Sequence, residues 1–422
     1  MKRVLASLGT AYLLTGATAW AEPQGALTGF VEVRAGARLQ EDEFEKAASL
    51  GELRLHLERE WDAWPAAVVR AAGDLVYDPV EADHAVDLET GRGAIDLREA
   101  NAVFRPFPFA DVKVGRQILT WGTGDLLFIN DLFPKDYRAF FIGRDDAYLK
   151  APSDAVRVSL FSQAANLDLV YTPRFDADRF VDGSRLSFFD PAVGRTVGRN
   201  ADVDPVNPDA WFEDDEVSAR VYRHFGAVET AAYVHHGFWK SPLGVLPAGR
   251  PFFSRLAVYG ASVRGPFARG IASAEFGFYD SLDDPTGSNP LVANSQFRFL
   301  AGLEREALPE LTIGAQFYLE RQGDFDARLE ALPSGAASPR RTRHLLTLRL
   351  TKLALRQTLT VGAFGFWSPS DDDGYGRLRA SYRLTDAWLV EAGANVFAGG
   401  RDRPFGQLRD NTNVFGGLRR SF

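Results

Sequence analysis

Alternation of apolar and polar side chains at every second residue is the sequence feature that most constrains the fold of this chain. In residues 27–38, for example, Leu27 and Val33 lie on one face of an extended strand, and Glu32 and Arg34 lie on the other. Successive side chains of a strand point to opposite faces of a sheet, so a period of two is typical of a strand with one apolar face. A helix would need a period of 3.6, which these segments lack.

About 18 segments carry this alternation, and we expect them to form the strands of one large sheet. The expected strands span 26–39, 50–61, 66–78, 94–104, 111–121, 154–161, 166–172, 215–225, 227–238, 256–264, 271–280, 295–305, 311–321, 342–352, 357–367, 375–384, 387–398 and 411–422. The number is even, as in bacterial single-chain barrels. The apolar parity of 94–104 slips near Glu99, which indicates a β-bulge.

The connections between these segments alternate between short and long. Short ones include 62–65, 162–165 and 307–310, whereas 79–93, 122–153, 173–214, 281–294 and 322–341 are long. Transmembrane barrels have short periplasmic turns and longer extracellular loops, and only alternate residues of their strands need be apolar. The pattern therefore predicts an all-β protein, a transmembrane antiparallel up-and-down β-barrel of about 18 strands.

Aromatic residues near the strand ends support a membrane barrel. Those that fall on the apolar face are Trp61, Tyr77, Tyr171, Phe225, Phe238, Phe278, Phe317, Trp367, Tyr382 and Trp388. Amphipathic rings are enriched at the level of the lipid headgroups. A soluble sandwich or β-helix would explain the alternation, but it would explain neither these aromatics nor the asymmetry of the connections.

The two ends of the chain indicate export to an outer membrane. Lys2 and Arg3 precede a short apolar stretch and an Ala-Trp-Ala site at 19–21, so we expect residues 1–21 to be a Sec signal peptide and 22–422 to form a single barrel domain. The last strand ends on Phe422, and it resembles the terminal signal that barrel assembly machinery recognises. These features predict a Gram-negative outer-membrane protein in contact with outer-membrane lipid and lipopolysaccharide.

Composition excludes several classes of function. The chain has no cysteine, which removes disulfide scaffolds, thiolate metal sites and cysteine nucleophiles. Removal of Lys2 and Arg3 with the leader would lower the formal net charge from −8 to −10, which argues against nucleic acid as a partner. The six histidines lack a convincing catalytic partner in the sequence. We therefore expect no cofactor, no metal site and no enzymatic activity.

Charged residues on the polar face of the strands are the candidate lining of a pore. The candidates are Arg34, Arg54, Arg70, Lys113, Arg157, Arg220, Arg298, Arg349, Arg377, Arg379, Arg383, Glu275, Glu304 and Glu320. Rings of charge in a pore set ion selectivity, and guanidinium groups suit carboxylate, phosphate or sulfate. Arg377, Arg379 and Arg383 together would form one basic wall. The alternative is a lumen whose charges pair with one another, with Glu391 and Glu320 as partners of this wall.

The connection 122–153 is too apolar for an exposed loop. Among its apolar residues are Leu127, Phe128, Phe133, Phe140 and Phe141. Long loops of this kind are usually functional or disordered, and this composition does not favour disorder. We expect the loop to fold into the barrel as a constriction; the alternative is packing over the barrel mouth or against a neighbouring subunit. The loop 173–214, in contrast, is rich in aspartate and is expected to be solvated.

The segment Val114–Gly122, with the sequence VGRQILTWG, resembles a strand of the alginate-export and related GRQ-type porins of proteobacteria. The match covers about a dozen residues, and Arg116 and Gln117 are its matched positions. Alternation places Gln117 inward and Arg116 outward unless a bulge intervenes. The mixed charge of the lumen departs from the strongly basic channel that an acidic polysaccharide would need.

Together these observations predict an outer-membrane channel for passive or substrate-selective passage of small hydrophilic solutes, anionic solutes included. A structural or adhesive barrel, or a scaffold for a partner, with a blocked lumen is the alternative, and a barrel enzyme comes third. Fold alone does not choose among these functions.

Overall fold

The computed structural model describes residues 25–64, 67–81, 85–191, 193–201, 203–334 and 339–422. The expected signal peptide, residues 1–21, lies outside these residues and stays a prediction. The described chain forms one 18-stranded sheet, three two-stranded hairpins within the loops, and a few short helices.

The sheet closes on itself as an antiparallel up-and-down barrel. Its strands are β1 (Leu27–Arg38), β2 (Ala48–Trp64), β3 (Ala67–Tyr77), β6 (Ile95–Phe107), β7 (Ala110–Ile118), β8 (Pro152–Leu160), β9 (Asn166–Thr172), β12 (Glu216–Phe225), β13 (Val228–Phe238), β16 (Arg255–Phe267), β17 (Gly270–Ser281), β18 (Gln296–Leu308), β19 (Leu311–Gln322), β20 (Thr342–Ala354), β21 (Leu359–Ser368), β22 (Asp373–Arg383), β23 (Trp388–Ala398) and β24 (Asn413–Ser421). Each strand pairs with the next along the chain, and β24 pairs with β1. The prediction of an all-β, 18-stranded barrel is confirmed.

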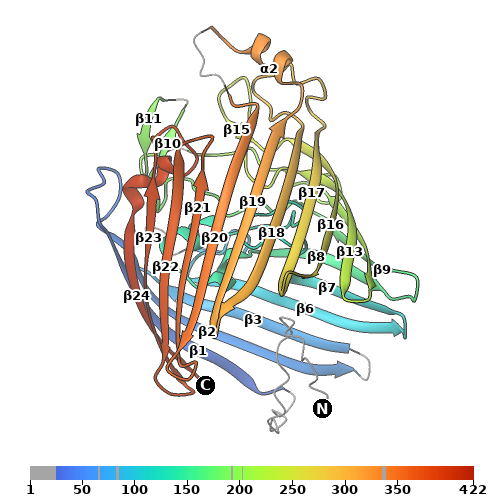
Figure 1. The fold of residues 1–422 in the computed structure, drawn as a ribbon, viewed down its shortest axis with the longest axis vertical. Coiled ribbons are helices and arrows are strands. Elements are labelled where there is room, and N and C mark those ends of the chain that lie inside the picture. Colours follow the sequence, from blue (N-terminus) through green and yellow to red (C-terminus); the bar gives the residue numbers. More distant parts are fainter. Residues whose placement is uncertain (1–24, 65–66, 82–84, 192, 202, 335–338) are drawn as a thin grey trace.

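The remaining elements lie in the long loops. The hairpins are β4 (Val86–Asp87) with β5 (Arg92–Gly93), β10 (Phe188–Asp190) with β11 (Arg195–Val197), and β14 (Gly244–Val245) with β15 (Pro251–Phe252); the α-helices are α1 (Tyr137–Ile142) and α2 (Phe325–Ala331). The C-terminus and the short turns lie at one end of the barrel, and α2, β10, β11 and β15 lie at the other (Figure 1). We call these the turn end and the loop end.

The first and last strands close the barrel through the final residue of the chain. The backbone N–H of Gly29 donates to the carbonyl oxygen of Phe422 at 3.1 Å, and the N–H of Phe422 donates to the carbonyl of Gly29 at 3.0 Å. The side chain of Phe422 is more than half exposed. Closure removes the unpaired sheet edge that an open sheet of this size would present to its surroundings.

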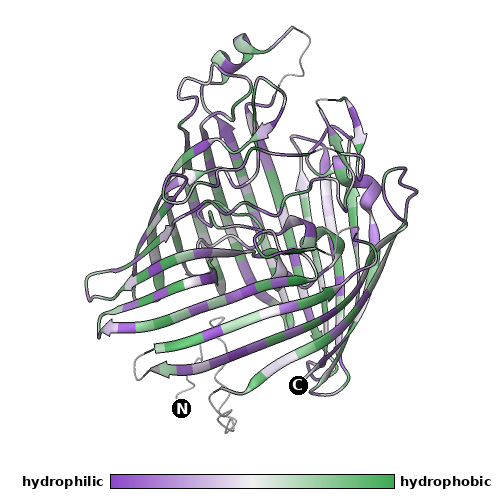
Figure 2. Ribbon diagram, turned by 180° about the vertical axis from the view of Figure 1, so that it is seen from behind, coloured by the Kyte–Doolittle hydropathy of each residue, from purple (hydrophilic) through white to green (hydrophobic). Residues whose placement is uncertain are grey.

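The outer face of the barrel is apolar. Bands of apolar and polar residues alternate along the strands (Figure 2), and the exposed apolar side chains include Val33, Leu53, Phe276 and Trp367. Most of the aromatics expected near the strand ends are exposed on this face, but Phe238 is buried under loop residues Phe175 and Phe253. None of the helices in the described part of the chain is long and apolar enough to cross a membrane.

A β-bulge interrupts β6 where the apolar parity slips. The register between β3 and β6 passes from Ala72 opposite Glu99 to Gly73 opposite Leu97, so Arg98 is the extra residue. Two consecutive side chains therefore reach the interior: Arg98 donates to the carbonyl of Lys150 at 2.6 Å, and Glu99 lies 3.4 Å from Lys113. The bulge predicted near Glu99 is present.

Candidate functional site

The connection between β7 and β8, residues 119–151, runs through the interior of the barrel; we call it the interior loop. Its side chains and backbone contact strands around the whole ring. The partners on the wall include Asp74 of β3, Glu52 of β2, Arg34 of β1, Arg419 of β24, Arg379 of β22, Arg349 of β20 and Glu275 of β17. A single segment can contact strands on opposite sides of a closed barrel only from within it.

One anchor of the interior loop is Glu275, an inward-facing carboxylate of β17. It accepts the backbone N–H of Thr123 at 2.7 Å and its hydroxyl at 3.0 Å, and the backbone N–H of Asn130 at 2.6 Å and its side-chain amide at 3.0 Å. Hydrogen bonds to a charged acceptor are worth about 1.5–3 kcal/mol each. Tyr279, four residues further along β17, donates its hydroxyl to the carbonyl of Ile129. This anchor fixes the first third of the loop.

The middle of the interior loop folds into the short helix α1. The carboxylate of Asp136 caps it by accepting the N–H of Ala139 at 2.7 Å, and Gly143 ends it with φ +92°. A side chain at Gly143 would collide with the ring of Phe415 on β24, since its Cβ would lie 2.4 Å from a ring carbon. Position 143 therefore requires glycine for both its backbone conformation and its proximity to the wall.

Helix α1 packs its aromatic residues against the inner wall of β21–β23. The rings of Phe140 and Phe141 lie 5.6 Å and 5.4 Å from the ring of Tyr375, and Phe141 lies 5.4 Å from Phe397. These four side chains are buried, so the barrel contains a small apolar core within its otherwise polar interior. Burial of such a side chain stabilises by about 1.5–3 kcal/mol, which holds α1 against this wall.

Two aspartates that follow α1 meet arginines on the same wall. Asp145 lies 2.9 Å from Arg379 and 3.4 Å from Arg419, and Asp146 lies 2.8 Å from Arg377. Burial acts to raise the pKa of Asp145, but Arg379, the N–H of Ala147 and Arg419 together lower it well below its ordinary value. The carboxylate of Asp145 is therefore ionised at any physiological pH.

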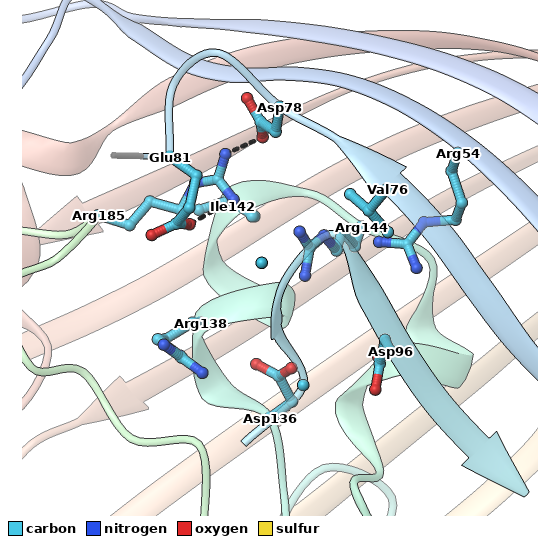
Figure 3. Close-up of a pocket in the computed structure, with 12 residues that line it drawn as sticks. Arg54, Val76, Asp78, Glu81, Asp96, Asp136, Arg138, Ile142, Arg144 and Arg185 are labelled. Atoms are coloured by element: carbon cyan, nitrogen blue, oxygen red, sulfur yellow. Dashed lines mark hydrogen bonds and ion pairs between the residues drawn. The ribbon is translucent and has the colours of Figure 1, made fainter. Parts of the chain in front are cut away.

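On the side of β2, β3 and β6, the interior loop leaves only a narrow cleft (Figure 3). Its volume is about 40 Å³, room for roughly three water molecules. Four arginines and four acidic residues share its lining, namely Arg54, Arg138, Arg144, Arg185, Asp78, Glu81, Asp96 and Asp136. Arg144 lies 2.7 Å from Glu52, and Arg54 lies 2.7 Å from both Glu52 and Asp74. The loop is thus tied closely to this wall.

A segment of the loop 173–215 holds the interior loop from the loop end; we call residues 175–182 the strap. Arg179 of the strap lies between two carboxylates, 2.8 Å from Asp96 on β6 and 3.2 Å from Asp136 on the interior loop. Asp178 accepts the N–H of Lys135 at 2.7 Å. Burial raises the pKa of Asp178, although Lys135 and Ser241 act to lower it.

Two pockets inside the barrel lie towards the turn end, beside β16–β22. One pocket of about 310 Å³ lies between residues 120–131 of the interior loop and the inner wall of β16–β20. A second pocket of about 220 Å³ lies between Phe140 and the wall of β20–β22. Arg349 lines both, and it pairs with Asp125 of the loop.

Most of the charged residues predicted to line a pore are paired with other interior groups. The partners are Glu391 for Arg34, Glu52 for Arg54, Glu58 for Arg70, Glu99 for Lys113, Asp168 for Arg157, Glu229 for Arg220, Glu320 for Arg298, Asp125 for Arg349, Asp146 for Arg377 and Asp145 for Arg379. Glu275 binds the interior loop. Within the described residues, the side chains of Glu304 and Arg383 have no ionic or hydrogen-bonding partner.

The basic wall expected from Arg377, Arg379 and Arg383 is mostly neutralised. Arg379 pairs with Glu391 as well as with Asp145, while Arg383 is exposed at the turn end of β22. Glu391 was predicted as a partner of this wall, whereas the aspartates of the interior loop were not. Alternation assigns no direction to loop residues, so it could not place these aspartates. The only feature of the sequence that indicated an interior position for them was that they directly follow an apolar loop segment.

The residues expected to form a constriction all lie on the interior loop and within the barrel. Phe140 and Phe141 belong to the apolar core, and Leu127 and Phe128 pack at its edge. Phe133 packs against Trp121, at 4.9 Å between ring centroids, in a separate cluster with Leu119 and Val170. The loop was expected inside the barrel, and its described residues lie there.

The two positions matched in the GRQ-type segment lie on opposite faces of β7. Gln117 is buried inward and donates to the carbonyl of Ala155 at 2.9 Å, while Arg116 pairs with Asp154 of β8 at 2.8 Å and reaches the carbonyl of Leu88. The register between β7 and β8 is uninterrupted here. The side chain of Arg116 therefore points outward, as alternation predicts, and no bulge between β7 and β8 turns it inward.

One histidine has a partner that the sequence did not reveal. His235 Nδ1 lies 2.8 Å from Ser218 Oγ on the paired strand, and His235 Nε2 lies 3.8 Å from Glu216 Oε1. All three side chains are at least 95% buried, and Glu216 is engaged by Lys240 and by the N–H of Phe238. A substrate could not reach Ser218 in this arrangement. No group of histidine, aspartate and glutamate side chains in the described part of the chain could hold a metal ion.

Comparison with known proteins identifies the fold but no family. No family model matches the sequence, and no curated protein matches it. Among solved structures, the chain is similar to OccAB1 of Acinetobacter baumannii, with a TM-score of 0.56 and 10% identity over 94% of this chain and 96% of that one. It is also similar to OccAB4 of the same organism, at TM-score 0.56 and 8% identity over 95% and 99% of the two chains.

A third structure, OccK11 (OpdR) of Pseudomonas aeruginosa, matches with a TM-score of 0.55 and 10% identity over 94% of this chain and 95% of that one. The fold is therefore that of the outer-membrane porins. The resemblance to the alginate-export and GRQ-type porins has no counterpart among these matches.

Proposed function

We propose that this protein is an outer-membrane channel through which small hydrophilic solutes pass. The observation that carries the proposal is the interior loop: it crosses the barrel, closes the β2–β6 side to about 40 Å³, and leaves pockets of about 310 and 220 Å³ beside β16–β22. A segment that narrows a wide barrel without filling it leaves room for a small solute. The porin fold and the apolar outer face support the same function and an outer-membrane location.

We infer in addition a preference for anions, which rests on the pocket beside β20–β22. Its lining includes the guanidinium groups of Arg349, Arg377 and Arg379 and the carboxylate of Asp146. The other carboxylates that pair with these arginines, Asp125, Asp145 and Glu391, are not among the residues that line it. A unit charge about 7 Å from a passing ion in water is worth about 0.6 kcal/mol, or roughly threefold in local ion concentration. Arg349 is the least constrained of the three, since its side chain is 29% exposed.

Single-channel conductance of the refolded protein in a planar bilayer tests the channel, and the reversal potential in a KCl gradient tests its selectivity. We expect stable current steps with chloride preferred over potassium. Arg349→Gln is expected to lower that preference by roughly sevenfold, because a charge that enriches chloride about threefold depletes potassium by about the same factor. Arg250→Gln, which removes a charge from the exposed pair with Asp204 at the loop end, is the matched control. Cation preference in the wild-type channel would contradict the anion inference.

Deletion of residues 126–142 tests whether the interior loop constricts the passage. We expect a higher conductance, because the deleted segment contains α1 and most of the apolar contacts with the wall. Deletion of α2, whose residues are not buried and which lies outside the barrel at the loop end, is the control and should leave conductance unchanged (Figure 1). An unchanged conductance in the first variant, with the barrel folded, would refute the constriction.

A structural or adhesive barrel with a blocked lumen is the second candidate. The observation that favours it is the apolar core of Phe140, Phe141, Tyr375 and Phe397, which fills the interior beside β21–β23. Absence of conductance from demonstrably folded protein would favour this candidate. For either function, we propose that barrel assembly machinery recognises Phe422 and that the outer face contacts membrane lipid and lipopolysaccharide.

A further inference from the structure

The larger interior pocket contains hydrogen-bonding groups that are not engaged by the protein. Ser273 on β17, Gln316 on β19 and Thr347 on β20 line it, and their side chains have no hydrogen-bond partner among the described residues. Gln316 Oε1 is buried, yet it is unpaired. Elsewhere in the interior, most charged and polar groups are bonded to one another. A buried polar atom without a partner is costly, so Gln316 Oε1, together with the uncommitted hydroxyls of Ser273 and Thr347 that line the same cavity, indicates a ligand that completes its hydrogen bonds.

Two glycines make the wall concave at this point. A Cβ at Gly302 would lie 3.1 Å from Gln316 Cγ and 3.3 Å from Ser273 Oγ, and a Cβ at Gly314 would lie 3.7 Å from Glu304 Oε2. The two glycines line the pocket, so the polar groups around them surround a hollow rather than a side chain. Neither has the positive φ that would require glycine, so these positions are explained by space and not by backbone conformation.

An aromatic side chain also lines the pocket. Trp121 lines the pocket from the interior loop. Its ring is held by Phe133, at 4.9 Å and 72°, and by Tyr233, at 6.1 Å. An indole fixed by neighbouring rings offers an apolar surface to a ligand without loss of side-chain entropy on binding.

The uncommitted charges of the pocket have both signs. Glu304 has no partner, Arg264 has none, and Lys150 bonds only to the hydroxyl of Thr120 within the described chain. A strongly anionic ligand would meet Glu304, and a cationic one would meet Arg264 and Lys150. Groups of both kinds, together with amide and hydroxyl side chains, suit a ligand that donates and accepts hydrogen bonds without carrying charge.

We propose that this pocket binds a neutral, polyhydroxylated solute of about monosaccharide size, through the unpaired groups of Ser273, Gln316, Thr347 and Glu304 and the ring of Trp121. Each sugar hydroxyl both donates and accepts, and the C–H faces of a sugar ring pack on an aromatic surface. The volume of about 310 Å³ is at the lower end of small-molecule pockets. The inference deepens the proposed function, since it names a substrate class for the same channel.

The test uses D-glucose as the ligand. Triethylene glycol is the comparison compound, because it is uncharged and of comparable size but carries only two hydroxyls. Binding is measured by isothermal titration of the refolded full-length protein in detergent, and block by the change in single-channel current. We expect saturable binding and block by glucose only. Gln316→Leu should raise the half-saturating concentration by about fivefold, as for one net hydrogen bond, and Gly302→Val should abolish saturation. Gln407→Leu is the matched control, because Gln407 is a half-buried glutamine of the 3-10 helix Gly406–Asn411 whose amide donates to the carbonyl of Pro404, away from the pocket.

The outcomes separate the site from the channel. Current steps without saturable glucose binding would overturn the site and leave the channel proposal standing. Saturable binding that depends on Gln316, in a protein that passes no current, would support the site and refute the channel. Equal effects of Gln316→Leu and Gln407→Leu, or preference for glucuronate over glucose, would overturn the neutral polyhydroxylated ligand.

Discussion

Substitution of Glu275 by alanine is expected to release the first third of the interior loop while the barrel stays closed. The change removes the acceptor of two backbone N–H groups, those of Thr123 and Asn130. A buried donor left without its acceptor costs about 1–3 kcal/mol, so docking of residues 120–131 should weaken by roughly 2–6 kcal/mol in total. Since 1.4 kcal/mol is tenfold, even the lower figure raises the undocked population about 30-fold.

Hydrogen exchange of the refolded protein, read by mass spectrometry on peptides that cover 120–131, measures this population directly. Exchange in these peptides should accelerate by about 30-fold or more in Glu275→Ala, and peptides of the barrel strands should not change. Glu229→Ala is the matched control, because Glu229 is also an inward carboxylate but pairs with Arg220 and His224 rather than with the loop. Unchanged exchange of 120–131 in a folded Glu275→Ala barrel would refute the assignment of Glu275 as the anchor.

Two further predictions concern the strap. Arg179→Gln leaves Asp136 buried without its cation and leaves Asp96 with Arg98 alone, at 3.6 Å. We therefore expect a loss of about 3–5 kcal/mol in docking of the strap, seen as new proteolytic cleavage between 175 and 182. Arg250→Gln, in an exposed pair, should cost at most about 1 kcal/mol. The raised pKa of Asp178 means that its contribution to docking is complete below the unfolded value of about 4 and is lost as pH rises through its raised pKa. Exchange of 175–182, corrected for intrinsic rate, should therefore be slower at pH 4 than at pH 7. Burial raises the pKa of Asp176 as well, so the double substitution Asp176→Asn/Asp178→Asn should remove that difference. Asp145 has a lowered pKa, so its contribution to docking is present above about pH 4 and is lost only as pH falls through that lowered value. Slower exchange of 175–182 at pH 7 than at pH 4 would therefore show that Asp145 or another carboxylate controls the strap.

The strands could be predicted from the sequence because the apolar outer face and the polar interior of the barrel each take every second residue of a pleated strand. Alternation in 27–38 follows directly from one apolar outward face and one interior face, and all 18 expected spans overlap observed strands. Even the bulge at Arg98 was visible, because an extra residue shifts the parity of every residue after it. The apolar content of 122–153 gave the position of the interior loop for a similar physical reason, since a solvated loop would not expose so many aromatic side chains.

The pairing inside the barrel could not be predicted, because it depends on contacts between residues far apart in the chain. Arg379 on β22 pairs with Asp145, which lies more than 200 residues earlier. The acidic loop 173–214 was expected to be solvated, but Asp176 and Asp178 turn inward and hold the backbone of residues 154 and 135. Composition alone does not distinguish an aspartate in water from one that accepts buried N–H groups. The pocket with unpaired polar groups could not be predicted from the sequence either. Its properties depend on which interior side chains have no hydrogen-bonding or ionic partner in the folded barrel.

The closure of the ring through Gly29 and Phe422 sets an order of events during assembly. Asp145 binds Arg419 and Gly143 lies against Phe415, and both wall residues belong to the last strand. The interior loop therefore cannot complete its contacts until the final nine-residue strand has entered the sheet. Contacts of such high sequence separation form slowly. Maturation of this protein should accordingly have two kinetic phases, ring closure followed by settling of the loop, and a newly closed barrel should pass through a wider, transiently leaky state.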